Sequence, residues 1–125
     1  MEKHLINDNQ IDEAIHMLKQ IKTSLNLNVK LTPRERKDMA SISTKRMEAI
    51  INILYEANKV PHKIPKELEL DKINELYETV MNLKLLSMAL SDLEKSIQNK
   101  YQFLGAKLYK KSFMIKKYFE LLFQT

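Results

Sequence analysis

The pair of residues best suited to hold a metal ion is Glu13 and His16, three positions apart in the segment EAIH. On a helix this spacing puts a carboxylate and an imidazole on one face, as the di-iron sites of helical bundles require. Such sites also need a second Glu-x-x-His pair and further glutamates pointing into the core. The sequence has no second pair, and Glu94 is the single glutamate near an apolar stripe. We therefore expect no metal site and no cofactor.

Catalytic side chains are equally sparse. The other two histidines, His4 and His62, stand far apart in the sequence, and cysteine is absent. Neither an HExxH motif nor a glycine-rich phosphate loop occurs. Without cysteine, a disulfide framework and a thiolate metal site are both excluded. We expect a protein that is not an enzyme.

Basic side chains are a second group of candidates, because the net charge of +5 is concentrated near the end of the chain. From Lys100 onward there are six lysines against the single acid Glu120, whereas residues 1–99 carry fifteen basic and fifteen acidic residues. A patch of this kind attracts nucleic acid, an anionic membrane or an acidic protein, although many solvated helices also carry one. The candidate phosphate contacts are Arg34, Arg36, Lys37, Lys107, Lys110, Lys111 and Lys117.

Apolar residues on the outer face of the last helix form a third group. Phe103, Met114 and Leu121 recur at intervals of eleven and seven residues, roughly 145° from the expected core stripe of that helix. An aligned apolar row on a small domain tends to mark a contact, and lysine stems can flank it. A second copy is the simplest partner, and packing of the first helix or of the LNLNVKL connection within the same chain is the alternative. The predicted interface comprises Phe103, Lys107, Lys110, Met114, Lys117, Tyr118 and Leu121.

The elements that must position these residues are predicted to be helices. One glycine, three prolines and abundant leucine, isoleucine, lysine and glutamate suit long helices and not tight-turned sheets. At 125 residues the chain is long enough for one domain with a core. We therefore predict an all-α protein, a single domain over residues 1–125 built as an antiparallel four-helix bundle with a shorter first helix.

Two capping boxes predict where the first helices begin. Asn7 with Gln10 precedes the first helix, and Thr32 with Glu35 precedes the second, whose first residue is Pro33. Between them LNLNVKL alternates like a strand, but it has no partner strand, so we expect an extended connection. The second helix is predicted to reach about Asn58, where KVPHKIPKE forms a linker. Its expected core residues are Met39, Ile42, Ile50, Ile53, Leu54 and Ala57.

The remaining sequence is predicted to form two helices. Asp71 is the expected cap of the third, whose apolar stripe includes Ile73 and Ile97. A single helix through to Phe123 would be about 80 Å long at 1.5 Å per residue and would be left half unpacked, so we place a turn near Gln98 and Asn99. Gly105 then lies inside the fourth helix and is expected to allow a close helix approach. The fourth core stripe is Tyr101, Leu104, Leu108, Ser112, Ile115, Phe119 and Leu122.

Several segments together resemble a known group of proteins. LTPRERKDM, TKRMEAIINILYEANKVPHKIP, LSMALSDLEKSI and LYKKS are similar to small bacterial all-helical bundle proteins with an LTPEER-like helix start, over residues 30–118. The similarity includes a tyrosine in the last helix, here Tyr109. The group has no established activity, so the resemblance implies a fold and no site. This chain departs from it at Gln98 and Asn99, where the group has a Gly-Ser-like break.

The functional expectation follows from these patterns. MEKHLINDNQ lacks the apolar region of a secretory signal, and no run approaches the roughly 18 apolar residues of a membrane span, so we expect a cytoplasmic protein. We predict a helical interaction or structural module that self-associates or docks a protein partner. The alternative is a nucleic-acid-associated protein that uses the basic last helix, although no helix-turn-helix, zinc module or aromatic RNA-binding signature is found.

Overall fold

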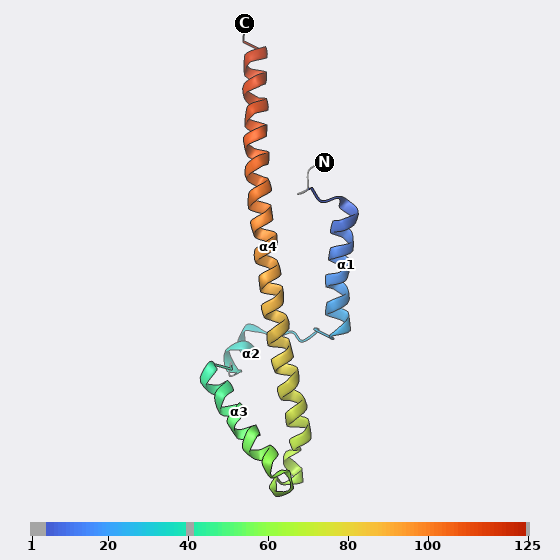
Figure 1. The fold of residues 1–125 in the computed structure, drawn as a ribbon, viewed down its shortest axis with the longest axis vertical. Coiled ribbons are helices and arrows are strands. Elements are labelled where there is room, and N and C mark those ends of the chain that lie inside the picture. Colours follow the sequence, from blue (N-terminus) through green and yellow to red (C-terminus); the bar gives the residue numbers. More distant parts are fainter. Residues whose placement is uncertain (1–4, 40–41, 125) are drawn as a thin grey trace. The chain divides into compact units, whose positions relative to one another are not determined.

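The computed structural model describes residues 5–39 and 42–124, and all of the regular structure in these two ranges is helical. The elements are α1 (Asp8–Ser24), α2 (Pro33–Asp38), α3 (Thr44–Lys59), two short 3₁₀ turns, η1 (Pro61–Lys63) and η2 (Lys66–Leu68), and α4 (Leu70–Leu122) (Figure 1). The chain divides into two units, residues 1–51 and 52–125. The all-α prediction is confirmed, whereas the four-helix bundle is not.

The capping boxes are present where the sequence predicts them. The side-chain oxygen of Asn7 accepts from the backbone N–H of Gln10 at 2.8 Å, and the Gln10 side chain accepts from the N–H of Asn7 at 3.0 Å. The Thr32 hydroxyl likewise accepts from the N–H of Glu35 at 3.1 Å, and the Glu35 carboxylate accepts in return from Thr32 at 3.3 Å. Each box satisfies two backbone donors that a helix start leaves without partners.

The predicted helix from Pro33 to Asn58 is wrong, because the structure breaks it in two. α2 ends at Asp38, Met39 has extended backbone, and α3 begins at Thr44. Ser43 supplies the physical reason: its hydroxyl accepts from the N–H of Arg46 at 3.2 Å, so a serine that would sit unfavourably inside a helix starts a new one instead. Of the six residues predicted to be buried on this helix, Leu54 alone is buried.

The second unit contains a helical hairpin formed by residues 52–59 of α3 and the start of α4. Each proline of the linker begins or precedes a 3₁₀ turn, and Val60 and Ile64 are non-helical, as their positions before proline require. After this reversal Asn58 of α3 and Asn74 of α4 bind each other through two side-chain hydrogen bonds of 3.0 and 2.8 Å. Leu54 is 8% exposed and is the sole buried residue among those described.

α4 is one helix of 53 residues, so the predicted turn at Gln98 and Asn99 is wrong (Figure 1). Residues 94–104 contain neither glycine nor proline, and asparagine and glutamine are tolerated within a helix at a cost of only a few tenths of a kcal/mol. The start also differs from the prediction. Glu69, in the left-handed conformation at φ 50°, is the N-cap, and Asp71 lies in the first turn.

The predicted core stripe of the last helix is consequently not a core. No residue of α4 is buried, and Tyr101 and Leu108 are 77% and 68% exposed. Gly105 makes no close approach in this structure, since a Cβ added there would meet nothing within 4 Å. The pairing expected between the third and fourth helices requires a chain reversal that α4 does not make.

Candidate interaction surface

The apolar residues of the predicted interface are exposed on the C-terminal half of α4. Phe103 is 46% exposed, Met114 62%, Tyr118 59% and Leu121 68%. Most of the set falls into two rows at seven-residue spacing. One row contains Lys107, Met114 and Leu121, and the other contains Phe103, Lys110 and Lys117. Seven residues are two helical turns, so each row follows one line along the helix. The row of Lys107, Met114 and Leu121 lies next to the longer row described below, and we call it the flanking row. The row of Phe103, Lys110 and Lys117 lies about 130° around the helix from the centre of that longer row.

A longer apolar row runs beside the flanking row along the whole of α4. Because the helix does not turn at Gln98, the two predicted stripes continue into one repeat with alternating steps of three and four residues, which passes through Lys111 and Tyr118 in place of Ser112 and Phe119. We call this row the seam. Its positions are Ile73, Leu76, Val80, Leu83, Ser87, Leu90, Glu94, Ile97, Tyr101, Leu104, Leu108, Lys111, Ile115, Tyr118 and Leu122.

The seam has the pattern of a coiled-coil contact. Twelve of its fifteen positions are apolar, the exceptions being Ser87, Glu94 and Lys111. Apolar residues repeating every 3.5 positions favour helices that wind around each other, each seam side chain entering a hole between four residues of the facing helix. This surface was not predicted, because a turn at Gln98 would divide it between two helices. The signal that reveals it is the unbroken spacing through Glu94, Ile97 and Tyr101.

Helix α3, which pairs with α4 in the hairpin, leaves most of the seam exposed. On α4, the half-buried residues nearest the linker include Asn74, Tyr77 and Met81, which lie about 90° around the helix from the adjacent seam positions. Of the seam positions near the linker, Val80 alone is half-buried, so helix α3 packs mainly beside the seam. Along the seam Leu76 remains 63% exposed and Ile97 56%.

The C-terminal part of α4 is apolar on further sides as well. Tyr109 and Phe113 stack with ring centroids 5.9 Å apart, and Phe119 stacks on Phe123 at 6.4 Å. The Lys107 ammonium lies 4.7 Å from the centroid of the Phe103 ring, a cation–π contact. A shallow hollow bordered by Asn99, Phe103 and Lys107 lies on the same helix. A helix this apolar around its circumference is normally packed by more than one neighbour.

Charge along α4 changes sign from one half to the other. Residues 70–96 carry five acids and three lysines, which leaves −2, and residues 97–122 carry six lysines and one glutamate, which leaves +5. Two of the charged residues, Glu94 and Lys111, occupy seam positions. The helix therefore offers an acidic half and a basic half on one continuous surface.

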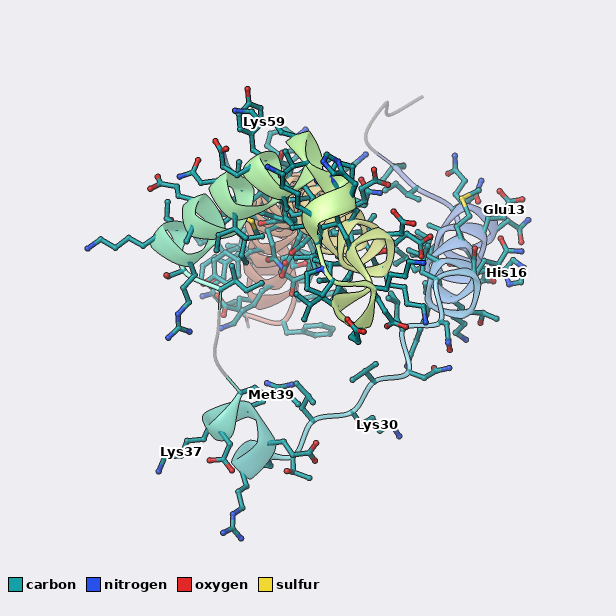
Figure 2. All side chains as sticks on the ribbon, turned by 90° about the horizontal axis from the view of Figure 1, so that it is seen from below. Glu13, His16, Lys30, Lys37, Met39 and Lys59 are labelled. Atoms are coloured by element: carbon teal, nitrogen blue, oxygen red, sulfur yellow. The ribbon has the colours of Figure 1, made fainter. Side chains whose placement is uncertain are left out.

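The candidate nucleic-acid contacts belong to both units. Arg34, Arg36 and Lys37 are exposed on the six-residue helix α2, where Figure 2 shows Lys37 projecting outward. The four lysines of the set, Lys107, Lys110, Lys111 and Lys117, are exposed on α4 in the second unit. The structure gives a local arrangement for each group and no single site that contains both.

Glu13 and His16 project from the same flank of α1, as their spacing predicts (Figure 2). Within residues 5–39 and 42–124, however, no cluster of three or more His, Cys, Asp or Glu side chains is suited to hold a metal ion. Over the same residues, no helix has both the length and the apolar character needed to cross a bilayer.

No protein-family model, curated protein or solved structure matches the chain. The similarity to LTPEER-type bundle proteins thus stays a prediction from sequence, and the functional argument depends on the surface of α4 itself.

Proposed function

We propose that the protein is a non-catalytic interaction module that binds another protein surface, most simply a second copy of itself, along the seam of α4 and the flanking row of Lys107, Met114 and Leu121. The observation that carries this proposal is an apolar repeat continued over a 53-residue helix that has no buried residue. Long helices owe most of their stability to packing of an apolar face. A partner along the seam supplies that packing.

The test compares a substitution in the seam with one beside it. Leu108→Glu places a charge in the middle of the C-terminal seam, whereas Gln102→Glu adds the same charge at an exposed position outside it. Light scattering over a range of concentrations should give wild-type and Gln102→Glu particles larger than one chain and a monomeric Leu108→Glu protein. A wild-type protein that stays monomeric at high concentration, with no protein copurifying, would contradict the proposal.

Nucleic-acid binding is a second candidate, supported by the +5 charge of residues 97–122. Each phosphate neutralised by a lysine releases counterions, so binding must weaken as salt rises. Replacing both Lys110 and Lys117 by glutamine should reduce the slope of log K against log salt by about 2. Failure of the wild-type protein to retard DNA or RNA at low salt would end this candidate.

A further inference from the structure

We propose that the partner along α4 is a second copy of the chain in antiparallel orientation, with Glu94 of one copy opposite Ile97 of the other. This inference rests on the proposed function and specifies its partner, direction and register. Four features of α4 support it: the charged seam positions, the opposite charge of its two halves, the position of its ends, and the apolar surface beyond the seam.

The charged seam positions exclude the simplest parallel arrangement. Two parallel, in-register helices would place Glu94 against Glu94 and Lys111 against Lys111 of the second copy. Burying two like charges in one layer is strongly unfavourable because they repel each other in addition to losing their hydration. In the antiparallel register Glu94 faces Ile97 and Lys111 faces Val80, so no seam layer contains two like charges. One polar residue in an otherwise apolar repeat is a known means of fixing register.

The two halves of α4 are electrostatically complementary in this direction. Antiparallel pairing sets the half with charge −2 beside the half with charge +5 at both ends of the dimer. Parallel pairing instead sets six lysines of one copy beside six of the other. Complementary potentials favour the correct orientation and raise the association rate, and juxtaposed like charges oppose the wrong one.

The ends of the helix fit the same register. With Glu94 opposite Ile97, Leu70 lies opposite Leu121, so almost all of α4 is paired. A shift by one heptad in either direction leaves about one heptad unpaired at an end of each helix. A stable interface buries about 800 Å² per partner, and the twelve apolar seam side chains of each copy supply apolar surface toward that area.

The arrangement also accounts for the broad apolar surface of the C-terminal half. That half of the second copy would lie along the seam near Ile73 and Val80, next to the side of α4 where α3 packs. It would thereby gain two neighbouring helices, as its aromatic surface requires. The antiparallel packing that the sequence predicts between two helices of one chain is then formed between two copies, because α4 continues straight through Gln98.

Crosslinking of single-cysteine variants tests the direction and register. The sequence contains no cysteine, so introduced thiols react without interference. Ser87→Cys and Leu104→Cys occupy facing seam positions in the proposed dimer, and Thr79→Cys and Met114→Cys occupy facing positions at its edge. The Thr79 and Met114 variants alter exposed side chains only. They keep the test valid if a cysteine at Ser87 or Leu104 prevents folding. Each variant is treated with a short bis-maleimide alone and in an equimolar mixture with its counterpart.

We expect covalent dimers in both mixtures and none with any variant alone, because each thiol lies far from its own equivalent in the second copy. Covalent dimers of Ser87→Cys alone would overturn the antiparallel direction. A wild-type dimer whose mixtures fail to crosslink would overturn the register. Light scattering on the untreated wild type distinguishes these results from failure of the proposed function, which would appear as a monomer.

Discussion

Two asparagines hold the α3–α4 hairpin through reciprocal hydrogen bonds. Asn58 also donates to the backbone carbonyl of Leu54 at 2.8 Å, so its side chain is fixed on both sides. Each amide supplies one donor and one acceptor to the other, a pairing that a charged side chain, which only donates or only accepts, cannot reproduce. The pair fixes the register of the hairpin.

Replacing Asn74 by alanine should therefore loosen the hairpin. Both reciprocal bonds are lost, and each partly exposed bond contributes on the order of 0.5–1 kcal/mol. Asn82→Ala, on the same helix at an exposed position, is the matched control. Thermal unfolding followed by circular dichroism should show a lower melting temperature for Asn74→Ala alone; equal melting curves would mean that the pair contributes nothing.

Thr32→Ala removes half of the capping box of α2. The expected cost is about 0.5–2 kcal/mol, and it should be local because the cap holds a helix of six residues. Hydrogen exchange at the amides of residues 35–39 should accelerate, by roughly tenfold for a loss of 1.4 kcal/mol. Unchanged exchange at these amides would show that the cap does not stabilise α2.

Among the elements, those with local start signals were predictable. The Asn7–Gln10 and Thr32–Glu35 boxes satisfy their own backbone donors, so no distant contact is needed to place them. The break before α3 was not predictable in this way. It depends on the hydroxyl of Ser43, and serine is only slightly unfavourable inside a helix. The turn at Gln98 was inferred from the packing needs of a single chain, and no residue there stops a helix. Placing a turn there also split the seam between two predicted helices, so its repeat of 3.5 residues was not recognised.

Gly105 is the weakest point of α4. Glycine inside a helix costs about 1 kcal/mol relative to alanine, because it restricts a backbone that is otherwise very free. A Cβ at this position meets nothing within 4 Å, so Gly105→Ala should raise the melting temperature and leave the oligomeric state unchanged. A weaker dimer in this variant would reveal a close helix approach at Gly105 between the copies.

At the scale of the whole molecule, stability should depend on protein concentration. Folding coupled to association makes the melting temperature rise with the amount of protein, because the partner binds the folded helix and not the unfolded chain. If the stability comes from contacts within one chain, the melting temperature should not change with concentration. Scans over a hundredfold range of concentration separate the two cases.

Met114→Glu tests the flanking row by the same two measurements, particle size and the dependence of the melting temperature on concentration. A contact between copies predicts a folded monomer in which the concentration dependence is lost, whereas a contact within one chain predicts a large loss of stability in a protein that is monomeric throughout. Gln102→Glu, also exposed on α4, controls for the added charge. A variant that keeps the size and melting temperature of the wild type would remove Met114 from the interface.

The length of α4 determines how far apart the two hairpin linkers would lie in the proposed dimer. In an antiparallel dimer the two hairpin linkers stand at opposite ends, separated by about 80 Å at 1.5 Å per residue. In such a dimer, α4 would set the distance between two partners bound at its ends. Deleting residues 98–104 removes two turns and keeps every face aligned, and small-angle scattering should record a particle shorter by about 10 Å.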